Sequence, residues 1–198
     1  MPGFSAQAPT PTELSPDLQR LFAELADSDR RASEMVHALS NDQLNWKPSE
    51  AEWSIAQCLD HLAISNTVYS AALHRAIEEA RQELVSAPIP LRPGVFGRAF
   101  IRSLEPPPKS KHRAPQKIVP GDRMDKDEVL RRFLESEEAM RTVIRNGARL
   151  DLNGIRFKNP FFWFLRFTVG TGLLIIAAHN RRHLWQAQMI LDNPSFPK

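Results

Sequence analysis

Two histidines near the C-terminal end of the chain have the spacing of metal ligands on one helix. His179 and His183 are four residues apart, so a helix places both imidazoles on the same face, one turn apart. Zinc sites on helices use this spacing. This spacing often arises by chance. The two histidines could therefore also be surface residues, or core residues whose ring nitrogens have hydrogen-bond partners in the protein.

A third histidine, His61, lies inside a different predicted helix. With His179 and His183 it would supply three nitrogen ligands and leave positions open for water or substrate, as catalytic metal sites do. Neutral imidazole suits zinc, nickel, iron(II) or copper better than magnesium or calcium. The three histidines therefore predict a divalent metal site, for which zinc or nickel is preferred and iron(II) is an alternative.

Polar side chains flank these ligands in the sequence. Gln57 and Ser65 lie one turn before and one turn after His61, and Gln186 follows His183 by three residues. Each could hydrogen-bond a ligand ring or a metal-bound water. For Gln57 we favour the alternative, a role in a helix capping box. For Gln186 the alternative is a polar residue at the end of the helix face that packs on the core.

Three further side chains are candidates for a role at the site. Cys58 lies three residues before His61 and could be a fourth ligand, although a lone cysteine is usually a small buried hydrophobe. Asp29 and Glu137 fall on apolar helical stripes, where a carboxylate is costly to bury unless it is paired. Either could accept the N–H of a metal-bound histidine or act as a general base; a pair with arginine is the alternative. The remaining histidines are interpreted as surface or loop residues: His37, His74 and His112.

Four helices must position these residues. The first begins at Ser15-Pro16-Asp17, and the second begins at Ser54, where Gln57 completes a capping box, and stops near Pro88. The third begins at Asp125, with Glu128 completing a second capping box, and ends near Gly147. The fourth runs from about Gly170 to Leu191. The first helix carries an apolar stripe with helical spacing: Leu18, Phe22, Leu25, Ala32, Val36 and Leu39.

The long connection between the second and third helices covers residues 87–123 and is rich in proline and glycine. It is too long for a tight hairpin, so it permits a crossover in which these helices need not be antiparallel neighbours. No alternating strand pattern is evident. We therefore expect an all-α fold, a four-helix bundle in one domain of residues 15–198, preceded by a flexible tail of residues 1–14.

Two runs resemble signatures of the DinB-like superfamily. The second-helix run is WSIAQCLDHL at 53–62, and the fourth-helix run is AHNRRHLWQ at 178–186. Two shorter motifs outside these helices, LNWKP at 44–48 and PQKIVP at 115–120, also match motifs usual in this superfamily. The resemblance spans roughly residues 15–192. It implies a four-helix bundle with a long crossover, and a metal triad that maps onto His61, His179 and His183.

Two functions from different classes stay open, the first implied by the resemblance and the second kept because no clear acid or base lies beside the three histidines in the sequence. Relatives include thiol-dependent transferases and isomerases that use low-molecular-weight thiols, and many are described as metal-dependent hydrolases. The first hypothesis is a metal-dependent S-transferase or hydrolase acting on a small-molecule substrate. The second is a non-catalytic stress-response protein that binds a metal or a ligand. A homodimer is expected in either case.

The net charge, the cysteine count and the apolar segments of the chain limit its possible partners and location. A formal net charge of +3 is too small to imply nucleic acid, and the single cysteine excludes an intrachain disulfide and fits the cytoplasm. Residues 1–16 lack the features of a signal peptide. The apolar stretch 161–178 contains Arg166 and four threonine or glycine positions, so we interpret it as a buried core helix and expect no membrane partner.

Two segments have open interpretations. Residues 91–117 carry seven basic side chains against one acid, Glu105, and could meet phosphate or an acidic thiol cofactor, or could simply be solvated. The aromatic cluster 161–164 could cap the core, line a pocket mouth or serve a partner surface. We favour the first of these.

Overall fold

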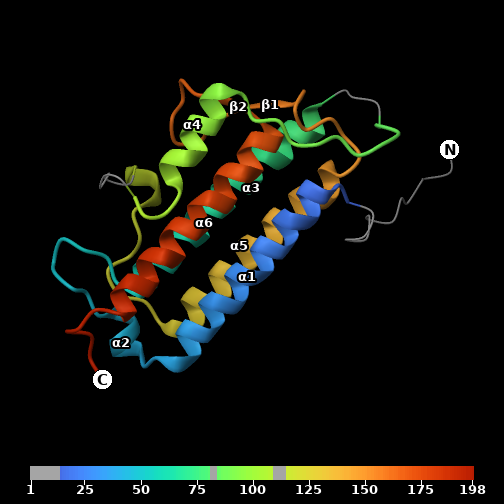
Figure 1. Cartoon of the computed structure of the whole chain (residues 1–198). Helices are drawn as coiled ribbons and strands as arrows, with labels where there is room; N and C mark the ends of the chain where they lie inside the picture. Colours follow the sequence, from blue (N-terminus) through green and yellow to red (C-terminus); the bar gives the residue numbers. More distant parts are fainter. Residues whose placement is uncertain (1–13, 81–83, 109–114) are drawn as a thin grey trace.

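The protein is described here by a computed structural model that covers residues 14–80, 84–108 and 115–198 (Figure 1). The predicted tail lies outside this range except for Leu14, which is buried beside the first helix. Most of the described chain is helical, as the all-α prediction requires. Its long helices are α1 (Pro16–Ala38), α3 (Ile55–Glu79), α5 (Lys126–Gly147) and α6 (Val169–Leu191). The shorter elements are α2 (Asn41–Asn45), α4 (Val95–Leu104), the 3-10 helix η2 (Gln116–Ile118), β1 (Arg156–Lys158) and β2 (Arg166–Thr168).

The long helices begin where local capping residues allow. Ser15 caps α1, and Ser54 forms a reciprocal capping box with Gln57 at the start of α3, as predicted. Asp125 caps α5 by accepting two backbone N–H groups, but the predicted capping box is incomplete. The side chain of Glu128 instead forms an ion pair with Arg131 on the exposed surface.

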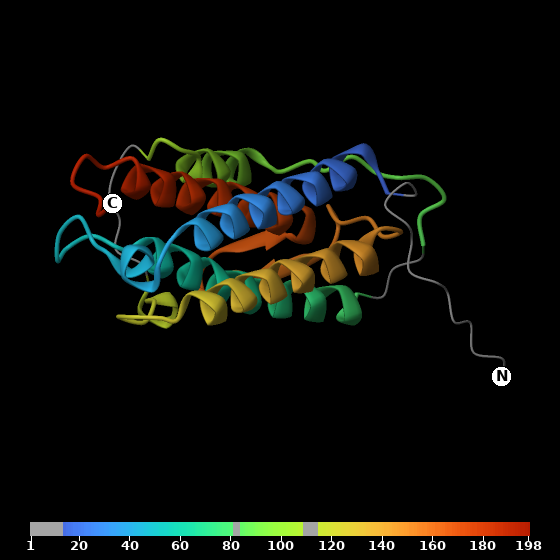
Figure 2. The same ribbon diagram turned by 90° about the horizontal axis from the view of Figure 1, so that it is seen from below.

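Contacts along the helices fix their directions. Asp60 pairs with Arg132, and Asn66 bonds Glu137, so residue numbers increase together along α3 and α5 and these helices run parallel. Contacts of α3 with α6 run the opposite way: His61 meets His179, whereas Leu73 lies against Gly172. α1 contacts α5 and α6 on the other side (Figure 2). Two parallel neighbours need a long connection between them, and residues 80–125 supply it.

Three details differ from the prediction. α3 ends at Glu79 rather than near Pro88, and the crossover contains an unpredicted helix, α4, which packs against the outside of α6 (Figure 2). Residues 161–168 are not part of a core helix. They form the loop and second strand of a small antiparallel hairpin in which Phe157 is opposite Phe167. None of the described helices is long and apolar enough to cross a membrane.

The core divides into two buried clusters along the helices. One lies at the hairpin end and includes Tyr69, Phe157 and Leu173. The other lies toward α2 and includes Leu62, Phe133 and, from the C-terminal part of α6, Leu184. The histidines of α3 and α6 therefore stand within well-packed helices, which hold their backbones in fixed positions.

Candidate metal centre

The structure brings His61, His179 and His183 together between α3 and α6. One ligand atom from each ring lies within 4.8 Å of the others. The Nε2 atoms of His61 and His179 are 3.1 Å apart. Two nitrogen ligands of a tetrahedral zinc ion, each about 2.0–2.1 Å from it, are separated by about 3.3 Å. The arrangement of the three rings therefore fits a shared cation.

A backbone carbonyl orients the ring of His61. Its Nδ1 lies 2.7 Å from the carbonyl oxygen of Ile118 in η2. Because a carbonyl can only accept, Nδ1 carries the proton and the neutral ring has its lone pair on Nε2. That lone pair faces His179, so the crossover directs the ligand atom of His61 into the cluster.

A glutamine orients His183 in the same way. Its Nδ1 lies 3.0 Å from Oε1 of Gln186, one turn further along α6. The amide oxygen accepts the Nδ1 proton, which leaves Nε2 of His183 as the free acceptor. Metal-binding histidines commonly have such a partner for their second nitrogen. Gln186 thus occupies the position that the sequence analysis considered for it.

Burial keeps the three rings neutral. Removal from solvent lowers the pKa of His61 and lowers those of His179 and His183 well below the usual value; neighbouring histidines and the charge of Arg182 add to this at His179. A neutral imidazole is the form that donates a lone pair to a metal. At neutral pH the cluster therefore presents acceptor nitrogens without having to lose protons.

Trp53 forms an apolar wall of the cluster. Its ring centroid lies 4.8 Å from that of His61 and 5.6 Å from that of His183. In the sequence Trp53 is only the first residue of the motif at 53–62, and no role was predicted for it. Its position just before the cap of α3 brings the indole back over the first turns of the helix, where it shields two of the rings from water.

Asp60 is a buried residue that the sequence analysis missed. Its Oδ2 accepts the N–H of Gly121 at 3.1 Å, and its Oδ1 pairs with Arg132 at 2.7 Å. Gln57 donates to the carbonyl of the same Gly121 at 2.9 Å. These bonds hold the segment after η2 on α3, and with it the carbonyl that orients His61. An acid directly before a histidine in an otherwise apolar run was the available signal.

The other residues considered beside His61 have different surroundings. Gln57 serves the capping box and Gly121, and among the described residues it does not bond a histidine ring. Ser65 is fully buried, and its Oγ has no hydrogen-bond partner in the described parts of the chain. Cys58 is fully buried, burial raises the pKa of its thiol, and it is absent from the group of gathered ligand atoms.

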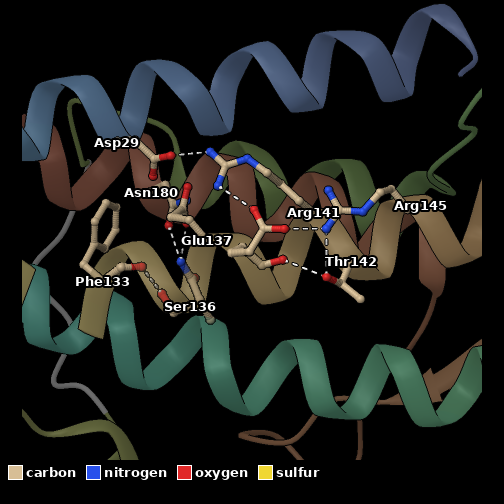
Figure 3. Close-up of polar contacts among 10 residues, drawn as sticks. Asp29, Phe133, Ser136, Glu137, Arg141, Thr142, Arg145 and Asn180 are labelled. Atoms are coloured by element: carbon tan, nitrogen blue, oxygen red, sulfur yellow. Dashed lines mark hydrogen bonds and ion pairs between the residues drawn. The ribbon is translucent and has the colours of Figure 1, made fainter. Parts of the chain in front are cut away.

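Asp29 on α1 is half-buried, whereas Glu137 on α5 is buried (Figure 3). Asp29 forms an ion pair with Arg141, which joins α1 to α5, as the alternative interpretation anticipated. Glu137 is fully buried, and its Oε1 accepts from Asn66 at 2.7 Å and from Asn180 at 2.8 Å. In the described residues, the second oxygen of each carboxylate has no hydrogen-bond partner. Neither carboxylate therefore bonds a histidine ring directly.

The remaining histidines stand apart from the cluster. His37 is exposed on α1, and His74 pairs with Glu78 across 3.2 Å on the surface of α3. His112 lies outside the described residues. The part of the chain that the structure describes thus contains one group of potential metal ligands, formed by the three predicted histidines.

The fold and the cluster define a mostly helical protein with three buried or half-buried histidines gathered between two of its helices. A comparison with protein families gives the same class: the family described as the DinB superfamily matches residues 24–187, a range that includes all three histidines and the crossover. The chain belongs to the DinB superfamily. No curated protein and no solved structure matches it.

Proposed function

We propose that this protein is a metal-dependent enzyme that holds one divalent ion, zinc or nickel, through His61, His179 and His183. The observation that carries the proposal is the orientation of the rings. The carbonyl of Ile118 and the amide oxygen of Gln186 accept hydrogen bonds from Nδ1 of His61 and His183. The Nε2 lone pairs of these two rings therefore converge beside His179. Iron(II) is the next candidate, because imidazole is also a good ligand for it.

The parallel pair α3 and α5, with its long connection, supports the four-helix bundle that the family resemblance implies. In such a bundle α1, α3, α5 and α6 would form the rigid frame, and the crossover would close one side of the site. The bonds of Asp60 and Gln57 to Gly121 are the contacts that would keep this side closed.

The chemistry we favour is thiol transfer. A divalent ion on three histidines has open positions, and when bound it can lower the pKa of a thiol or a water and polarise an electrophile. The chain would hold the ion, exclude water with Trp53, and leave the half-buried side at His179 for a small-molecule thiol. Hydrolysis of a small substrate by the same centre is the second reaction we consider.

One observation favours a non-catalytic role instead. Asp29 is paired with Arg141, and Glu137 contacts the asparagines of neighbouring helices, so neither candidate base reaches a ligand ring. A protein that binds a metal or a small ligand without turnover would need no base. We therefore keep a stress-response binding protein as the alternative, and retain the homodimer and the cytoplasmic location as parts of either proposal.

An activity assay distinguishes these two functions. Metal-free protein is reloaded with zinc, nickel or iron(II), and conjugation of low-molecular-weight thiols to 1-chloro-2,4-dinitrobenzene is followed. Metal-dependent conjugation that is lost in His179→Ala supports the transferase. A protein that binds the ion tightly yet conjugates no thiol and hydrolyses no model ester in any metal form would support the binding protein.

A further inference from the structure

An exposed aromatic and cationic face lies at the hairpin end of the molecule, and its α4 part runs along α6 to Ser103, which accepts a hydrogen bond from Arg182 beside the metal centre. α4 and the hairpin β1–β2 form it together (Figure 1). Their segments join through ring contacts, Phe96 with Phe167 at 5.8 Å and Phe100 with Phe162 at 6.3 Å. We call this surface the hairpin face. Its exposed members are Arg92, Val95, Phe96, Arg98, Arg102, Arg156, Lys158, Trp163, Phe164 and Arg166.

Large apolar side chains protrude from the hairpin face. Trp163 is 84% exposed and Phe164 65% exposed on the loop between the strands, while Val95 and Phe96 are 77% and 58% exposed at the start of α4. Soluble proteins scatter single exposed hydrophobes, but a cluster on one face usually marks an interaction site. The predicted role of residues 161–164 as a cap on the core holds only for Phe161, which packs against buried residues.

The charges of the hairpin face all have one sign. Residues 84–104 and 152–191 contain no aspartate or glutamate, yet they supply all six of the cations of this face. Lys158 and Arg166 are directly opposite each other on the two strands, and both are exposed. Like charges in this position destabilise a sheet. Nothing in the packing of the hairpin requires this pair, and an anionic partner would offset the repulsion between the two charges.

Of the acids shown in contact with these segments, two already have cationic or backbone partners, and Asp151 accepts the backbone N–H of Asn153 at 3.0 Å. Asp17 accepts the backbone N–H of Leu91 and forms an ion pair with Arg20. Glu105, at the end of α4, pairs with Arg181. The six cations of the hairpin face therefore outnumber the acids in contact with it.

We infer that the hairpin face docks on an anionic lipid membrane, with Trp163 and Phe164 entering the interface. Tryptophan and phenylalanine on a protruding loop, flanked by lysine and arginine, are the composition that lies at the boundary of headgroups and acyl chains. A protein partner would need a pocket for these rings, whereas a fluid interface accepts them without one. A second copy of the chain would bring cations against cations. The docking departs from the expectation of no membrane partner and leaves the interpretation of the metal centre unchanged.

The proposal is tested by sedimentation of the full chain with vesicles of phosphatidylglycerol and phosphatidylcholine, compared with pure phosphatidylcholine. Binding to the anionic vesicles, a blue shift of tryptophan emission and weakening by salt are expected. Lys158→Glu with Arg166→Glu should lower the affinity at least about 30-fold, since each cation near an anionic surface contributes about fivefold. Trp163→Ala with Phe164→Ala should abolish sedimentation at physiological salt.

Matched variants keep the test specific. Arg30→Glu with Arg131→Glu reverses two exposed cations on α1 and α5, and Met189→Ala removes an exposed apolar side chain of α6. Both should bind vesicles like the unmodified chain, and Trp163→Phe should bind while losing the blue shift. If the charge reversal impairs folding, Lys158→Gln with Arg166→Gln replaces it.

Absence of vesicle binding at low salt would overturn the proposal. Equal loss in the control variants would do so too, as would binding that needs the metal and disappears in His179→Ala. Capture of an acidic protein in place of vesicles would assign the hairpin face to a protein partner instead.

Discussion

The Nε2 atoms of His61 on α3 and His179 on α6 face each other across 3.1 Å. The proton of His61 is on Nδ1, where it bonds Ile118, so its Nε2 is an acceptor. Nε2 of His179 can either donate a hydrogen bond to this acceptor or, where both rings bind one cation, present a second lone pair. The third ring and its partner Gln186 favour the cation, because they add a further acceptor at the same place.

Gln186→Ala tests the orientation of His183. Without the amide oxygen the ring loses the partner of its Nδ1 proton, so both tautomers and several orientations become available. We expect the affinity for zinc to fall about 10-fold while the fold is unchanged. Gln188→Ala, which removes a glutamine of the same helix that bonds Asp192 on the surface, is the control. Competition with a zinc chelator measures both; equal affinities in the two variants would refute the role of Gln186.

Asp60→Ala tests the attachment of the crossover. The change removes the acceptor for Gly121 and the partner of Arg132 in a buried position, which should lower the free energy of unfolding by about 2 kcal/mol. Metal affinity should fall as well, because the carbonyl of Ile118 is no longer held. Urea denaturation and chelator competition give the two quantities. In the control, Asp42→Ala removes a surface ion pair with Arg123 and should change neither.

Glu137 predicts a specific dependence of stability on pH. Burial raises its pKa from an ordinary value of 4.5 to about 8, against a smaller lowering by the hydrogen bond from Asn180. The folded protein therefore holds a proton that the unfolded chain loses above pH 4.5. The stabilisation is complete below that pH and is lost as pH rises to about 8, with a slope of at most about 1.4 kcal/mol per pH unit.

Glu137→Gln keeps the acceptor for Asn66 and Asn180 but cannot ionise. The free energy of unfolding of the unmodified chain, minus that of this variant, should fall from pH 5 to pH 8 and then become constant. The histidines contribute equally to both proteins and cancel in the difference. Glu135→Gln on the exposed side of α5 should give a difference that is flat over this range. A flat difference for Glu137→Gln as well would show that Glu137 ionises normally.

Gly172 allows the close approach of α6 to α3 and the hairpin. A Cβ at this position would lie 2.7 Å from Cδ2 of Leu73 and 2.8 Å from Cε1 of Phe157. Alanine is favoured over glycine in a helix by about 1 kcal/mol, but overpacking of a buried site costs about 1–3 kcal/mol. Because Phe157 is buried and stiff, we expect Gly172→Ala to be destabilising. Gly121→Ala, where the nearest atom to a Cβ is Cγ of Met124 at 3.9 Å, should be close to neutral in the same thermal unfolding measurement.

Local signals predicted much of this structure. Ser15, Ser54 and Asp125 cap helices because a side-chain oxygen and the next three backbone N–H groups are enough to define a helix start. The histidine spacing on α6 and the resemblance around His61 identified the residues of the cluster. The apolar stripes also placed Glu137 in the interior, although its partners come from other helices and were not predictable from periodicity.

The helix α4, the hairpin and the role of Asp60 were not predicted, because they depend on contacts between residues far apart in the sequence. α4 lies in a segment rich in glycine and proline, and its helix is stabilised by packing on α6, where Gly97 fits against Thr171. The strands of the hairpin have three residues each, too few to show an alternating pattern. The role of Asp60 depends on where residue 121 returns to α3, and no local pattern encodes that return.

Metal binding by the purified protein tests the central claim most directly. Metal-free chain is titrated with zinc and nickel by calorimetry, and metal content is measured after gel filtration. We expect one ion per chain, and a loss of at least 100-fold in affinity in each of His61→Ala, His179→Ala and His183→Ala, with no change in His37→Ala on the exposed surface of α1. A chain that holds no stoichiometric ion after loading with either metal, or variants that keep full affinity, would contradict the assignment.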